Sequence, residues 1–169
     1  MRRLLILFAA SLHLWTVVML VNDALSSRQI YLFAGALFVT YAALSQPLRP
    51  GLFASLLAGL VCDAQAPVTF GTHLLLFAAA HLILFHVRER VPREDTLSVV
   101  AVVLVVNLAL FLVFSLTQIH AVPVASALWP RLVVDLICSQ IFVGLITPWF
   151  FSLQSAALAM AQVRRDDPA

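Results

Sequence analysis

Six apolar stretches, separated by short polar turns, occupy almost the whole chain. They cover residues 4–21, 30–45, 50–65, 68–87, 97–119 and 130–153. A helix needs about 20 mostly apolar residues to cross the hydrocarbon core of a bilayer. The chain is 63% hydrophobic and 11% charged, whereas a soluble domain carries about 25% charged residues. The pattern predicts an all-α fold, a polytopic integral membrane bundle of six transmembrane helices forming a single domain over residues 1–169.

The third stretch is the shortest, because only residues 52–62 are continuously apolar. Pro50 suits the first turn of a helix, and a helix over 50–65 would be about 24 Å long. The arginines indicate that this short third helix crosses the membrane. With six spans, one side carries Arg2, Arg3, Arg49, Arg88, Arg90, Arg93, Arg164 and Arg165, and the other side carries Arg28 and Arg131. Cytoplasmic segments are rich in arginine and lysine, so both termini are expected in the cytoplasm.

Small and polar residues recur along the third stretch. Ser55, Gly59 and Asp63 are four residues apart and share one helix face. Small residues at this spacing let another backbone come close, so this face is expected to pack on a helix or a partner. Asp63 either caps the helix at the water boundary or has a functional role, because ionisable groups in a membrane are costly. These two alternatives are equally open.

Four more polar residues fall inside the fifth and sixth stretches. Arg131 and Asp135 are four residues apart, which favours a local ion pair over a proton relay. Asn107 and Gln140 would lie at similar depth if the last two helices were antiparallel neighbours. A hydrogen bond between them would hold the helices together.

The sequence lacks the residue patterns of common catalytic sites. The histidines have no partner at metal-ligand spacing, no serine has an obvious base, and no glycine-rich phosphate loop occurs. The arginines are scattered over several turns, which is typical of membrane topology and not of a nucleic-acid surface. We therefore expect no enzyme activity, and no catalytic, metal or cofactor site.

The segment "GLVCDAQAPVTFG" carries a family resemblance. Gly59, Asp63 and Gly71 fall on the fixed points of the signature of the rod shape-determining protein MreD family, and Pro67 lies in the short loop between them. The chain is also similar to that family in length, in its six short-looped spans and in the late "PWFF". Pro67 followed by valine and threonine departs from the family's usual order of loop residues.

The resemblance implies a non-enzymatic scaffold of the bacterial elongation machinery, located in the inner membrane. Its expected partners are membrane lipid, MreC, the RodA glycosyltransferase and a class B penicillin-binding protein, with MreB reached indirectly. The family is similar in fold to the S-components of energy-coupling-factor transporters. The alternative function is therefore an S-component-like subunit that binds a small molecule such as a vitamin.

Overall fold

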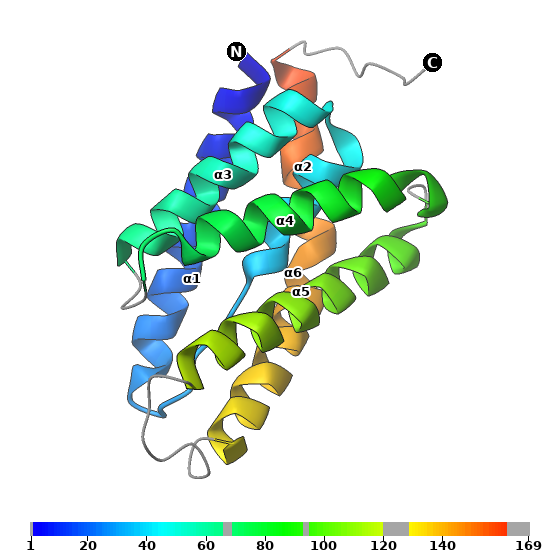
Figure 1. Cartoon of the computed structure of the whole chain (residues 1–169). Helices are drawn as coiled ribbons and strands as arrows, with labels where there is room; N and C mark the ends of the chain where they lie inside the picture. The colour runs from blue at the N-terminus through cyan, green and yellow to red at the C-terminus, as the bar shows by residue number, and fades with distance from the viewer. Residues whose placement is uncertain (1, 66–68, 93–94, 120–128, 162–169) are drawn as a thin grey trace.

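A computed structural model describes residues 2–65, 69–92, 95–119 and 129–161. The described residues form an all-α bundle with no strand (Figure 1). The α-helices are α1 (Arg2–Ser26), α2 (Gly35–Ser45), α3 (Leu48–Gln65), α4 (Thr72–Val87), α5 (Thr96–Ile119) and α6 (Trp129–Met160). A 3₁₀ turn, η1 (Arg88–Arg90), follows α4. Each of the six apolar stretches thus contributes one helix.

Helix lengths differ from the predicted ranges at several ends. α1 and α6 extend beyond 4–21 and 130–153 because polar residues at the ends of an apolar run can continue a helix. α3 begins two residues before the predicted start at Pro50 and ends at the predicted Gln65. Three helical segments are long and apolar enough to cross a membrane, namely Arg2–Ser26, Thr96–Thr117 and Trp129–Met160.

The second helix differs most from expectation. It was predicted over 30–45, yet α2 begins at Gly35, and residues 30–34 have no helical structure. Eleven helical residues are about 17 Å long, and five extended residues add about 16 Å. The segment therefore covers roughly the 30 Å of a bilayer core with only sixteen residues. Leu32, Phe33, Ala34 and every residue of α2 except Ser45 are buried.

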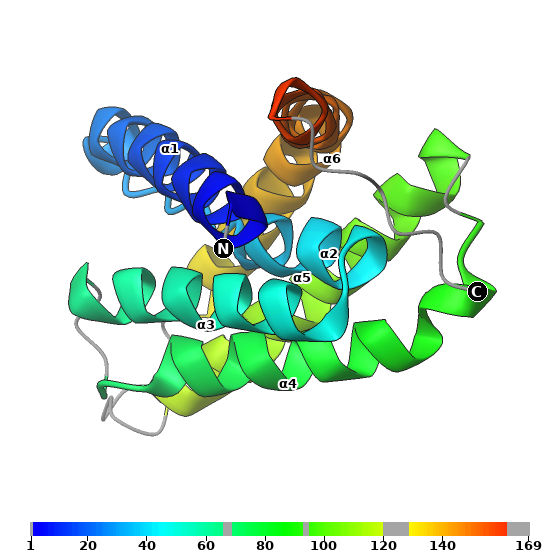
Figure 2. The ribbon, with the colours of Figure 1, turned by 90° about the horizontal axis from the view of Figure 1, so that it is seen from above.

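α2 is the central element of the bundle. It contacts α3, α4, α5 and α6, and in Figure 2 it lies in the middle of the surrounding helices. Figure 1 shows that α1 begins and α6 ends at the same end of the molecule. The turn between α2 and α3 is joined to the end of α4, because Arg88 Nη1 donates a hydrogen bond to the Gln46 carbonyl at 3.2 Å.

Capping residues set where two helices start. Gly71 has a φ of +96°, a left-handed conformation that glycine adopts without strain, and α4 starts at the next residue rather than at the predicted residue 68. Asp95 precedes α5 and accepts hydrogen bonds from the Ser98 hydroxyl and from the backbone N–H groups of Ser98 and Leu97. These donors, led by the hydroxyl, hold the pKa of Asp95 below its usual range.

The described residues combine an apolar surface with an interior in which many polar side chains lie among the apolar ones. Large apolar side chains are exposed along the helices, for example Leu5, Ile83, Val105 and Leu145, each at least 65% exposed. The buried set includes many polar side chains: Ser11, Thr40, Gln46, Ser55, Asp63, His73, His81, Asn107, Ser115, Asp135, Ser139, Thr147 and Gln154. Buried polar groups need hydrogen-bond partners, so these residues define where a site can be sought.

Candidate functional site

The predicted small face of α3 packs against α4. A Cβ built on Gly59 would lie 2.7 Å from Leu74 Cα and 2.9 Å from the His73 carbonyl oxygen. One turn earlier, Ser55 Oγ lies 2.9 Å from His81 Nδ1. The face predicted to receive another backbone therefore receives the next helix of the same chain. It is an internal contact.

Asp63 lies near the C-terminal end of α3, at one end of this contact. Its side chain is fully buried, and its two oxygens accept hydrogen bonds from the backbone N–H groups of Gly71, His73 and Leu74 at 2.8–3.1 Å. His73 Nδ1 adds a fourth bond at 2.9 Å. Asp63 therefore caps α4, the following helix. Of the two alternatives left open by the sequence, the geometry favours capping, although the capped helix is not the one that carries Asp63.

Two histidines on the same face of α4 have different surroundings. His73 has a carboxylate on Nδ1 and lies between the rings of Phe77 and Phe114. His81 is fully buried, and its Nε2 has no hydrogen-bond partner. No group of three or more metal-ligating side chains occurs among the described residues.

A second polar cluster holds the extended residues before α2. Asn22 Oδ1 accepts from the Leu32 N–H at 2.7 Å, and Asn22 Nδ2 donates to the Leu32 carbonyl at 3.1 Å. Asp135 Oδ1 accepts from the Tyr31 N–H at 2.9 Å. These side chains replace the backbone hydrogen bonds that a helix would have supplied there.

The same cluster continues toward the middle of the bundle. Ser139 Oγ accepts from the Phe33 N–H at 2.9 Å and donates to the Asp135 carbonyl at 2.5 Å. Asn107 Nδ2 donates to the Phe33 carbonyl at 3.2 Å, and its Oδ1 accepts from the Ala36 N–H at 3.3 Å. Residues from α1, α5 and α6 thus converge on one stretch of backbone.

The predicted hydrogen bond between Asn107 and Gln140 is not formed. Asn107 is used by the α2 backbone, and Gln140 Nε2 donates to the Leu104 carbonyl at 3.2 Å. Gln140 Oε1 has no partner. The prediction was wrong because residues 30–34 are extended and take Asn107 as a backbone partner, which no local sequence pattern indicates.

The predicted ion pair between Arg131 and Asp135 is present but long. Arg131 Nε lies 3.9 Å from Asp135 Oδ2, and the arginine side chain is 54% exposed. The closer partner of Asp135 is the Tyr31 N–H. Asp135 therefore serves mainly to hold the extended segment.

Sequence reasoning missed Asn22 entirely, and it assigned no role to Ser139 or to the dyad of His73 with Asp63. The four-residue spacing of Asp135 and Ser139 was a usable signal, whereas Asn22 stands near the end of an apolar run and resembles a boundary residue. Pro67, and the arginines Arg93, Arg164 and Arg165, lie outside the described residues.

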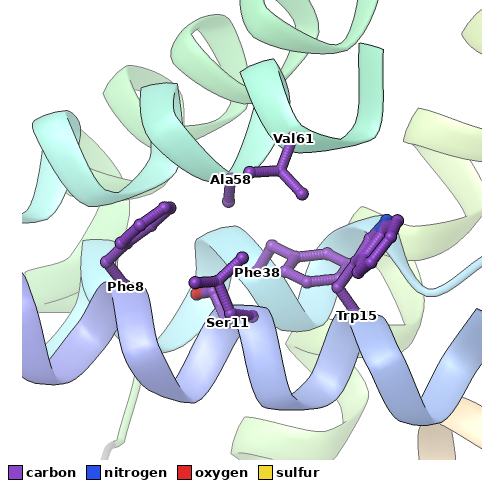
Figure 3. A pocket seen from close by; sticks show the side chains of 7 residues that line it. Phe8, Ser11, Trp15, Phe38, Ala58 and Val61 are labelled. Atoms are coloured by element: carbon purple, nitrogen blue, oxygen red, sulfur yellow. The ribbon is translucent and has the colours of Figure 1, made fainter. Parts of the chain in front are cut away.

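A shallow groove lies between α1 and α3 (Figure 3). Its lining is almost wholly apolar and includes Phe8, Trp15, Phe38, Ala58 and Val61. The groove has no room for a water molecule. It offers no polar constellation that would recognise a small polar ligand.

No family model, no curated protein and no solved structure matches this chain. The function is therefore argued from the arrangement of its own residues.

Proposed function

We propose that this chain is an integral membrane protein with six spans that acts as a non-enzymatic scaffold for other membrane helices. One observation carries the proposal: large apolar side chains are exposed on the surface, while many polar side chains lie buried within the apolar core. Exposed leucine, isoleucine and valine side chains suit lipid or a partner helix. The buried Asp63, Asn107, Asp135 and Ser139 all bond to backbone of the same chain, so their described bonds serve to fix the shape of the bundle.

The resemblance to the MreD family suggests the cellular process in which this scaffold acts, which is bacterial cell elongation. Gly59, Asp63 and Gly71, the signature residues, meet in one place, because Asp63 accepts the Gly71 N–H and Gly59 packs on Leu74. These signature residues hold α3 against α4. A rigid contact of this kind suits a scaffold, which must keep a fixed surface for its partners. We propose a role in bacterial cell elongation in the inner membrane, with MreC, RodA and a class B penicillin-binding protein as partners and MreB reached through them.

Gentle-detergent purification of the tagged full chain from its own membranes tests the proposal. Co-elution of MreC and the wall synthases, followed by loss of rod shape on depletion, is the expected result. An untagged strain and a tagged unrelated six-span protein serve as controls. Recovery of the chain with neither MreC nor a wall synthase, together with normal cell shape on depletion, would reject this role.

A second candidate is the small-molecule binding subunit of a transporter, similar to an S-component. The discontinuous second span favours it, because transporters bind substrates and ions at broken helices near the membrane centre. The extended backbone argues against it. The N–H groups of Tyr31, Leu32 and Phe33 and the carbonyls of Leu32 and Phe33 are already engaged by side chains of the same chain, namely those of Asn22, Asp135, Ser139 and Asn107. Co-purification with an ATPase module and a bound vitamin would select this function over the scaffold.

A further inference from the structure

We propose that the end of the bundle formed by the α2–α3 turn and by η1 binds the phosphate of an anionic phospholipid through Arg49 and Arg90. This proposal concerns a lipid site and goes beyond the scaffold role. It requires that the chain lie in a membrane, and it does not depend on the identity of any protein partner.

Arg88 brings the two turns together. Its guanidinium lies 3.8 Å from the centre of the Phe85 ring, and its Nη1 donates to the Gln46 carbonyl at 3.2 Å. A guanidinium over an aromatic ring is held by cation–π attraction. Arg88 is thereby used inside the protein, and its hydrogen bond joins η1 to the turn between α2 and α3.

Arg49 and Arg90 follow the two residues of this hydrogen bond closely in the sequence, and among the described residues they have no side-chain partner. Arg49 follows Gln46 by three residues and Arg90 follows Arg88 by two. Both side chains are exposed, and neither forms an ion pair or a hydrogen bond with another described residue. Two acidic residues, Glu89 and Asp95, are exposed nearby, and the three arginines Arg49, Arg88 and Arg90 outnumber them.

The exposed guanidinium groups of Arg49 and Arg90 indicate the chemical class of the ligand. Guanidinium groups bind phosphate oxygens with paired hydrogen bonds, and anionic headgroups attract arginines at the membrane surface. Exposed apolar side chains lie close to the arginines in the sequence, since Phe53, four residues after Arg49, is 57% exposed and Val87, three residues before Arg90, is 37% exposed. A phospholipid can place its anionic headgroup on the arginines and its acyl chains on the apolar side chains, whereas free phosphate would contact only the arginines.

Thermal unfolding of the purified full chain in a mild neutral detergent tests the site. The probes are mixed micelles with phosphatidylglycerol, mixed micelles with phosphatidylcholine, and inorganic phosphate alone. The variants are Arg49→Gln, Arg90→Gln and, as the matched control, Arg28→Gln. Arg28 is exposed at the opposite end of the bundle and forms no bond through its side chain with the described residues, so its variant loses the same charge elsewhere.

Phosphatidylglycerol is expected to raise the unfolding midpoint of the wild type and of Arg28→Gln equally. The rise should be at least twofold smaller in Arg49→Gln and in Arg90→Gln. Equal rises in all three variants would overturn the site, because overall charge would then explain binding. An equal rise with phosphatidylcholine, or with inorganic phosphate, would overturn the lipid assignment. If a variant is too unstable to melt, the lipid molecules retained in native mass spectrometry provide the same comparison.

Discussion

At the scale of single residues, the contact between α3 and α4 depends on the lack of a side chain at Gly59. The His73–Leu74 backbone occupies the place where a side chain would begin, with Leu74 Cα 2.7 Å from a Cβ built on Gly59. Real Cβ atoms do not come so close to backbone atoms, and backbone atoms cannot move aside as the tip of a flexible side chain can. The close approach of the two helices therefore requires glycine there.

Gly59→Ala should lower the stability of the fold by about 1–3 kcal/mol, the usual cost of overpacking. Gly144→Ala is the matched control, because a Cβ there would meet only Leu104 Cδ2 at an ordinary 3.7 Å. Alanine in a helix interior is better than glycine by about 0.5–1 kcal/mol, so this variant should be neutral or stabilised. Unfolding in detergent measures both, and a loss in Gly144→Ala as large as that in Gly59→Ala would contradict the packing argument.

Asp63 is the second residue on which this contact depends. Asp63→Leu leaves three backbone N–H groups and the Nδ1 of His73 without an acceptor. Each unpaired buried group costs about 1–3 kcal/mol, so the variant should lose about 3 kcal/mol or more. Asp63→Asn keeps one acceptor oxygen, so its stability should lie between that of the wild type and that of Asp63→Leu. Chemical denaturation in detergent gives the order, and wild-type stability in Asp63→Leu would show that the residue is only a boundary residue.

At the scale of elements, the segment before α2 needs hydrogen-bond partners for its buried backbone groups, and neighbouring helices supply them. Residues 30–34 are extended, and three of the five, Leu32, Phe33 and Ala34, are buried, so their backbone groups cannot rely on water. A polar group left unpaired in an apolar medium costs several kcal/mol. The partners come from three other helices. They are Asn22 of α1, Asn107 of α5, and Asp135 and Ser139 of α6. These four polar residues are best explained as substitutes for missing backbone hydrogen bonds.

Replacement of Asn107 by leucine tests that explanation. The variant leaves the Phe33 carbonyl and the Ala36 N–H unpaired, and it should lose about 2 kcal/mol or more. An ordinary side-chain bond between membrane helices contributes about 0.6 kcal/mol, which is too small for this effect.

Gln140→Leu is the matched control for Asn107→Leu. Gln140 donates one bond to a helix carbonyl, and its Oε1 is already unpaired. This variant should change the stability by no more than about 0.6 kcal/mol. Similar losses in Asn107→Leu and Gln140→Leu, compared by unfolding under one set of conditions, would mean that holding the extended segment is not what Asn107 does.

At the scale of the whole molecule, the helix directions and the arginines predict one membrane orientation. The start of α1 and the α2–α3 turn lie at one end of the bundle (Figure 1), and Arg88 of η1 bonds to that turn. The described arginines of these three segments are Arg2, Arg3, Arg49, Arg88 and Arg90. Arg28 and Arg131 lie at the other end, where the Tyr31 N–H bonds to Asp135. Positive residues favour the cytoplasmic side, so the first end should face the cytoplasm.

Cysteine labelling tests this orientation. In a chain with Cys62 and Cys138 replaced by serine, a cysteine at Glu89 should react with a membrane-impermeant thiol reagent only after the cells are opened. A cysteine at Ser27 should react in intact spheroplasts. Both positions are exposed in the fold, so differences in burial do not confound the comparison. Labelling of the Glu89 position from outside would reverse the proposed topology and remove the short third span.

The sequence alone predicted the number of helices, the helical third stretch and the small face of α3. These features depend on local hydrophobicity and on spacing along one helix, which a sequence displays directly. The acceptors of Asp63, the extended segment before α2 and the role of Asn107 depend on which helices become neighbours. Asn107 and Phe33 are 74 residues apart, and no local pattern links them. Only the tertiary structure decided those partners, because a buried backbone group is satisfied by whatever side chain the packing of other helices brings to it.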